Sequence, residues 1–121
     1  MVRAGLEVTG GSQDLQQLVK DVVRYINSNL SRDLTLDYIA DHFFISKFYL
    51  SRAFKQHMNV TIHSYIRQRR LFLAKQLLYN GVPPTEVYRQ CGYSDYSSFF
   101  RAFKEKHGCA PKHFCFQNGE I

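Results

Sequence analysis

A duplicated segment constrains the fold of this chain more than any other feature. The tetrapeptide Arg-Ala-Phe-Lys occurs at residues 52–55 and again at residues 101–104. Asn59 and Gly108 follow the two copies at equivalent places, and both residue types tolerate the left-handed backbone that commonly ends a helix. The repeated tetrapeptide and its matching stop signals predict that the chain contains two copies of one structural unit.

Helical periodicity surrounds both copies. Apolar residues recur at spacings of three and four along most of the chain, and no stretch alternates apolar and polar residues over the length of a strand. We therefore predict an all-α fold of about seven helices. Short helices over residues 36–43 and 84–91 precede the two copies, so that each unit is a helix, a turn and a second helix. The expected helix starts are Ser12, Thr35, Ser46, Thr61, Pro84, Ser94 or Asp95, and Pro111.

These expected helices divide the chain into successive parts. Residues 1–12, which contain a Gly-Gly-Ser sequence, are predicted to be a flexible linker or tail, and residues 13–121 to be the folded domain. The two helix-turn-helix units cover about residues 35–58 and 84–107, and a linker helix over about residues 61–80 joins them. The residues expected on one apolar face of the linker helix are Ile62, Ile66, Leu73 and Leu77.

The net charge of +6 lies wholly within residues 35–121, because residues 1–34 are neutral overall. This charge fits an acidic partner, although on its own it fits solubility as well as nucleic-acid binding. Cys91, Cys109 and Cys115 form no C-x-x-C pair, so we expect small buried residues in a reducing cytosol and neither a disulfide framework nor a zinc site.

Several classes of protein are not supported by the sequence. No apolar stretch reaches the roughly 18–20 residues of a membrane span, and the N-terminus lacks the apolar core of a signal peptide, so we expect a cytoplasmic protein. No nucleophile–base pair, carboxylate dyad, phosphate-binding loop or metal-ligand spacing is recognisable. We therefore expect neither an enzyme nor a metal or cofactor site.

The second helix of each unit carries the candidate functional residues. Its inner face is expected to hold Phe54 in the first unit and Phe99 with Phe103 in the second. The outer face is then free to enter a major groove, which is about 12 Å wide. Arg at such a place suits bidentate hydrogen bonding to guanine, and Ser can pair with several bases. The outward residues are Lys47, Ser51, Arg52 and Lys55 in the first unit, and Ser97, Ser98, Arg101 and Lys104 in the second.

The second unit resembles the signature of the AraC/XylS family of bacterial transcription regulators. Residues 92–104, followed by Gly108 and Pro111, are similar to its pattern G-F-x-D-x-S-x-F-x-R-x-F-K…G-x-x-P, and the resemblance extends over roughly residues 14–116. It implies an AraC-type DNA-binding domain in a cytoplasmic, nucleoid-associated bacterial protein. Family members usually activate transcription by contacting RNA polymerase, and many carry an upstream effector-binding domain. The base contacts that the resemblance implies are Phe48, Ser51 and Arg52 in the first unit, and Tyr96, Ser97, Ser98, Phe100 and Arg101 in the second.

Three positions depart from the family pattern. Tyr88 stands where a small alanine is common, so its helix either packs differently or exposes the ring. Asn59 replaces a usual glycine, and Asn is tolerated in the left-handed region. Phe100 stands where a small polar residue is common. Either Phe100 touches thymine methyl groups, which we favour, or the second unit reads DNA weakly.

Together these features predict sequence-specific binding of double-stranded DNA by a transcription regulator. A linker helix over residues 61–80 would be about 30 Å long, and successive major grooves on one side of a duplex lie about 34 Å apart. Two recognition helices of one chain therefore suit adjacent major grooves, and their head-to-tail order predicts an asymmetric site. The alternative prediction is a helical protein-interaction module whose basic face binds an acidic protein.

Overall fold

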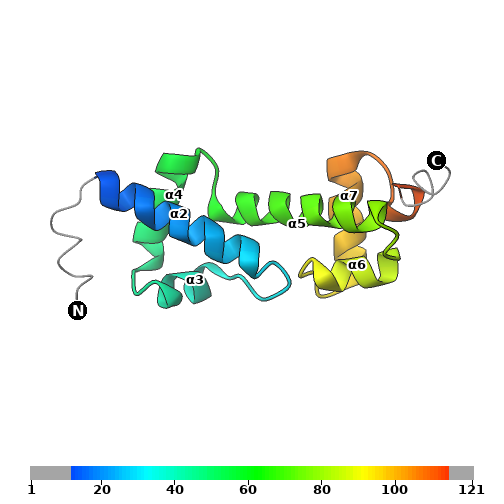
Figure 1. Cartoon of the computed structure of the whole chain (residues 1–121), viewed down its shortest axis with the longest axis horizontal. Helices are drawn as coiled ribbons and strands as arrows, with labels where there is room; N and C mark the ends of the chain where they lie inside the picture. The colour runs from blue at the N-terminus through cyan, green and yellow to red at the C-terminus, as the bar shows by residue number, and fades with distance from the viewer. Residues whose placement is uncertain (1–11, 115–121) are drawn as a thin grey trace. The chain divides into compact units, whose positions relative to one another are not determined.

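The computed structural model describes residues 12–114 of the chain (Figure 1). No strand occurs within this range, which confirms the predicted all-α class, and none of its helices has the length and hydropathy needed to cross a membrane. The predicted tail and Cys115 lie outside the described residues, except that α2 begins at Ser12. Residues 111–114 form a last helical turn. The helices before that turn are α2 (Ser12–Ser28), α3 (Leu36–His42), α4 (Lys47–Met58), α5 (Ile62–Tyr79), α6 (Pro84–Gln90) and α7 (Tyr96–His107).

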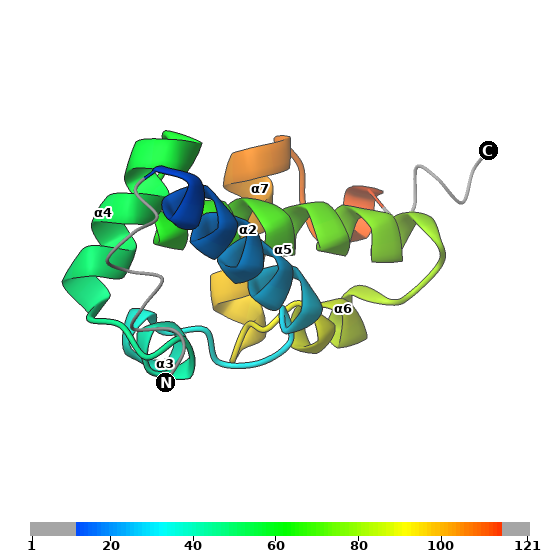
Figure 2. The same cartoon turned by 60° about the vertical axis from the view of Figure 1, so that its left-hand side comes forward.

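The described helices belong to two compact units. The first unit comprises residues 12–29 and 34–65, and the second comprises residues 30–33 and 66–114. Within the first unit, α2 and α3 both pack against α4, as Figure 1 and Figure 2 show. Within the second unit, α6 packs against α7. Each unit therefore contains a helix, a turn and a second helix, and these are α3 with α4 and α6 with α7.

Capping side chains begin the helices at the places that the sequence predicted. Such a side chain satisfies a backbone N–H group that has no partner in the first helical turn. Asp95, and not Ser94, is the cap of α7, whereas α6 begins with proline in its first turn and has no capping side chain. In each capped case a side-chain oxygen accepts a hydrogen bond from the N–H three residues later. The pairs are Thr35 with Tyr38 (3.1 Å), Ser46 with Tyr49 (3.1 Å), Thr61 with Ser64 (3.0 Å) and Asp95 with Ser98 (2.7 Å).

Left-handed residues end the second helix of each unit. Asn59 after α4 has φ 63°, and Gly108 after α7 has φ 82°. The equivalence that the repeat predicted is therefore confirmed. The turns inside the units also contain left-handed residues, Phe44 (φ 58°) in the first and Gly92 (φ 85°) in the second. Phenylalanine is uncommon in this region, and Phe44 leaves 85% of its surface exposed.

Aromatic and aliphatic side chains form the core of the second unit. Val87 of α6 and both Phe99 and Phe103 of α7 are fully buried, as the periodicity predicted. Cys91 is also fully buried, and burial raises the pKa of its thiol to about 12, so it remains an uncharged, small apolar residue. Cys109 is only half-buried, so the prediction of buried cysteines is confirmed for Cys91 alone.

The buried side of α5 differs from the predicted one. Ile62 and Ile66 are buried as expected, but Leu73 and Leu77 are only half-buried. The prediction of one continuous apolar face was wrong because the two halves of α5 contribute to different units, each with its own packing. In the second half the buried residues lie on another side of the helix, and they are Leu71, Ala74 and Leu78.

A partly buried arginine holds a distant segment in the second unit. Arg70 Nε donates a hydrogen bond to the Leu30 carbonyl (3.0 Å), and Arg70 Nη2 donates one to the Arg32 carbonyl (2.6 Å). Burial lowers the pKa of Arg70, but an arginine stays protonated, so the two carbonyl dipoles face a full positive charge. A Cβ on Gly92 would collide with the Leu30 carbonyl oxygen and lie 2.7 Å from the guanidinium of Arg70. Residues 30–33 thus pack closely against Arg70 and Gly92.

Replacing Gly92 by alanine should destabilise the chain more than replacing Gly108. Both glycines have φ above 80°, so both substitutions incur backbone strain of order 1–3 kcal/mol. Only Gly92→Ala adds a collision, since nothing lies within 4 Å of a Cβ at Gly108. Chemical denaturation should show an extra loss of about 1 kcal/mol or more in unfolding free energy for Gly92→Ala. Equal losses would show that the packing of Leu30 and Arg70 against Gly92 is loose.

Candidate nucleic-acid interface

Buried side chains fix which side of α4 faces solvent. Leu50, Ala53 and Phe54 are all buried, so the opposite side of the helix is exposed. Phe48, on that side, leaves 71% of its surface exposed. We call the exposed side the α4 reading face. Its central residues, which lie within about 60° of one another at 3.6 residues per turn, are Phe48, Arg52 and Lys55.

Lys47 and Ser51 flank the centre of the α4 reading face. Lys47 Nζ lies 3.4 Å from Asp37 Oδ1 and 5.9 Å from the centre of the Phe48 ring. Both members of this ion pair are well exposed, and such pairs contribute little to stability. Lys47 can therefore leave Asp37 for a phosphate group at small cost. Ser51 is half-buried beside the core.

The same geometry recurs in α7. Its buried side holds Ala102 with the two core phenylalanines, and its exposed side is the α7 reading face. No ion pair with a described carboxylate engages the Arg or Lys at the centre of either reading face. These cationic groups are therefore available to an anionic ligand. The central residues of the α7 reading face are Ser97, Arg101 and Lys104, the repeat equivalents of Phe48, Arg52 and Lys55.

The other three predicted contacts of the second unit lie at the edges of its reading face. Ser98 is half-buried, and both its N–H (2.7 Å) and its hydroxyl (3.2 Å) are hydrogen-bonded to the Asp95 carboxylate. Tyr96 and Phe100 are half-buried too, with ring centres 6.1 Å apart. The structure thus places these residues beside the core, and their contacts with bases stay predictions.

The Asp95 carboxylate shapes the electrostatics at the start of α7. The backbone N–H of Ser98 and then its hydroxyl donate to this carboxylate and lower its pKa, and the charge of Arg101 lowers it further. Asp95 is therefore ionised at neutral pH, where it complements the positive end of the helix. The same charge repels phosphate groups from the first turn of α7.

The sequence suggested either that the helix packs differently around Tyr88 or that the Tyr88 ring is exposed, and each alternative holds in part. The ring is half-buried and meets the Tyr96 ring edge-on, with centres 5.8 Å apart. The Arg89 guanidinium lies 5.6 Å from the centre of the Tyr88 ring, and its Nε lies 3.5 Å from the Tyr88 hydroxyl. The unit accommodates a large residue here by packing the ring at the edge of its core.

Tyr49 is a surface residue that the sequence analysis did not include. It is the repeat equivalent of Ser98 and leaves 44% of its surface exposed beside the α4 reading face. Its backbone N–H donates a hydrogen bond to the cap Ser46, which places Tyr49 in the first turn of α4. Aligning the two repeats residue by residue would have indicated it.

Comparisons with known proteins agree with this geometry. A family model described as a helix-turn-helix domain matches residues 39–115. The regulatory protein SoxS of Escherichia coli is 30% identical over 100 residues, which cover 82% of this chain and 94% of SoxS. The regulatory protein PocR of Salmonella typhimurium is 27% identical over 107 residues, which cover 88% of this chain but 35% of PocR. The chain therefore spans about a third of the length of PocR and nearly all of SoxS.

The description of a similar solved structure names the family. It is a transcriptional regulator from Chromobacterium violaceum described as containing an AraC-type DNA-binding domain, and it matches with a TM-score of 0.75 at 25% identity. The match covers 91% of this chain and 96% of that one. The chain belongs to the AraC family. It is an AraC-type DNA-binding domain of a bacterial transcription regulator, and this reading is favoured over the protein-interaction module.

Asp95 should make the stability of this AraC-type domain depend on acid pH. Because folding lowers the pKa of Asp95, its ionised form stabilises the domain fully above the unfolded value, about 3.9. That stabilisation is lost as the pH falls through the lower pKa of the folded state. Asn also caps helices well, so Asp95→Asn removes the charge and keeps the cap. The difference in unfolding free energy between the wild-type chain and Asp95→Asn should shrink below about pH 4. A difference that does not change with pH would contradict the stabilising role of the Asp95 charge.

Proposed function

We propose that the chain binds one asymmetric site in double-stranded DNA, with α4 and α7 in adjacent major grooves. The observation that carries the proposal is the pair of equivalent reading faces, each with an exposed arginine and an exposed lysine above buried aromatic residues. Arg52 and Arg101 would hydrogen-bond guanine. Lys55 and Lys104 would neutralise phosphates and release counterions.

The length of α5 supports the use of neighbouring grooves. This helix has 18 residues, which corresponds to about 27 Å along its axis. Major grooves on one side of a duplex recur about every 34–36 Å. A connection of that length, together with the reach of the flanking helices, fits one turn of DNA. The two units follow one another head to tail in the chain, which supports a site without two-fold symmetry.

The remaining predicted contacts divide by chemistry. In the first unit we propose base contacts by Phe48 and Ser51 and a phosphate contact by Lys47. In the second unit Ser97 contacts a base directly from the centre of the reading face. Tyr96, Ser98 and Phe100 contact the DNA from the edges, where Phe100 meets a thymine methyl group.

The regulatory role is also part of the proposal. We propose a cytoplasmic, nucleoid-associated activator that contacts RNA polymerase, with residues 13–121 as its DNA-binding part. An effector-binding domain would precede this part and join it through residues 1–12. The support is that the relatives include both PocR, of which the chain spans 35%, and SoxS, of which it spans 94%.

Selection of bound duplexes from a random pool should give an asymmetric site. We expect two blocks of specified base pairs with centres about 10–10.5 base pairs apart. The chain without any partner should protect both blocks in a footprint. A strictly palindromic site bound only by a dimer, or protection of a single block, would contradict the proposal.

Arg52→Ala and Arg101→Ala should each weaken binding to the selected site by about 1–3 kcal/mol and relax the base preference in one block only. Lys55→Ala should weaken selected and scrambled duplexes equally and reduce the salt dependence by about one counterion. Arg24→Ala, an exposed arginine on α2 in an i,i+3 pair with Asp21, is the matched control and should leave both affinities unchanged. Unchanged base preferences in both reading-face arginine variants would refute their role in recognition.

A further inference from the structure

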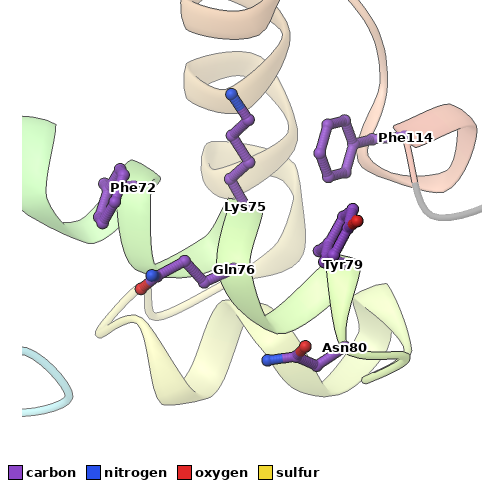
Figure 3. A pocket seen from close by; sticks show the side chains of 6 residues that line it. All are labelled: Phe72, Lys75, Gln76, Tyr79, Asn80 and Phe114. Carbon is purple, nitrogen blue, oxygen red and sulfur yellow. The ribbon is translucent and has the colours of Figure 1, made fainter. Parts of the chain in front are cut away.

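An aromatic and basic surface lies along the second half of α5, within the second unit. Two adjoining hollows of about 300 and 400 Å³ share Phe72 and Lys75 in their linings. In Figure 3, Lys75 extends between the rings of Phe72 and Phe114, and the Tyr79 ring lies next to Phe114. We call this surface the α5 groove, formed by Arg69, Phe72, Lys75, Tyr79, Lys106 and Phe114.

Two rings of the α5 groove, Phe72 and Tyr79, are exposed, and a cation lies near Phe72 and near Phe114. Phe72 leaves 45% of its surface exposed and Tyr79 leaves 66%. The Arg69 guanidinium lies 5.1 Å from the centre of the Phe72 ring, and Lys75 Nζ lies 5.9 Å from that of Phe114. Such cation–π contacts orient both partners. The groove therefore presents apolar ring surface directly beside positive charge.

The charge of the α5 groove is positive. Neither hollow is lined by a described aspartate or glutamate, whereas Arg69, Lys75 and Lys106 all line the second one. The nearby carboxylate of Glu105 does not reduce this positive charge fully, because it forms an ion pair with Arg67 (2.8 Å). His107 also lines the second hollow, but burial lowers its pKa, so it is neutral at pH 7 and adds no charge. Three cations beside exposed rings complement a ligand that is both acidic and apolar.

This groove does not lie on the α7 reading face. At 3.6 residues per turn, Lys106 lies about 140–180° around α7 from Ser97, Arg101 and Lys104. A duplex whose major groove holds the α7 reading face therefore meets the side of α7 that is opposite to Lys106. A ligand in the α5 groove would therefore leave the α7 reading face open to DNA.

We propose that the α5 groove binds an acidic segment of a partner protein, with an aromatic or aliphatic side chain of that segment against Phe72 and Tyr79. Its carboxylates would pair with Lys75 and Lys106, and its apolar side chain would cover rings that water now contacts. Aromatic and cationic residues of this kind are those that contribute most to protein–protein binding. The partner and the DNA would be bound at the same time.

A labelled synthetic peptide of alternating Glu and Leu with a central Phe tests the proposal. Fluorescence anisotropy measures its affinity for the free chain and for the chain on its selected duplex. Lys75→Glu and Phe72→Ser should each weaken peptide binding by about tenfold or more, which corresponds to about 1.4 kcal/mol. Both variants should keep the wild-type DNA affinity, which also shows that they fold. Lys20→Glu, the same charge change at an exposed site in the first unit, should leave peptide affinity unchanged.

Each contrary outcome would overturn the proposal. Absence of peptide binding to the wild-type chain would do so, as would equal binding by Lys75→Glu or by a peptide with Ser in place of Leu and Phe. Displacement of the duplex by the peptide would show that the peptide binds a reading face instead of the α5 groove. Loss of DNA affinity in Lys75→Glu would show that the α5 groove itself contacts DNA. Because the peptide is also measured on the free chain, and circular dichroism shows folding of both variants without DNA, failure to find a DNA site would not affect this test.

Discussion

Complete burial of the inner sides of α4 and α7 is the constraint on which both reading faces depend. Phe54 in the first unit, and Phe99 with Phe103 in the second, have no room to turn outward because protein interiors are closely packed. Rotating either helix by one residue, about 100°, would bring a buried ring to the surface at a cost of a few kcal/mol. The direction of each outer side chain is therefore set by residues that never touch DNA.

A second constraint comes from the partly buried charge of Arg70. A guanidinium withdrawn from water needs acceptors, and the carbonyls of Leu30 and Arg32 supply them. These carbonyls lie in the stretch between α2 and α3, so residues 30–33 join the second unit although the helices on either side belong to the first. The close approach leaves no space for a side chain at Gly92, and this explains glycine at that turn independently of its φ angle.

The sequence predicted the interactions between residues close together in the chain and did not predict those between residues far apart. Caps such as Ser46 and stops such as Asn59 are decided within four residues, so the sequence located them. The partners of Arg70 lie 40 and 38 residues away, where no local pattern can indicate them. The buried side of α5 depends on which unit each half of the helix joins.

The two reading faces occupy equivalent positions in the repeat but differ in the chemistry that they offer. In the second unit Asp95 already engages the N–H and hydroxyl of Ser98, and the rings of Tyr96 and Phe100 are half-buried. This leaves Ser97 and Arg101 as the polar groups that can approach base edges freely. The α4 reading face keeps Lys47 and Ser51 beside its central residues. Each face offers one arginine for a bidentate contact, which contributes about 1–3 kcal/mol of discrimination. The proposed difference between the faces therefore lies at their first central position, where α4 presents the exposed ring of Phe48 and α7 presents the hydroxyl of Ser97.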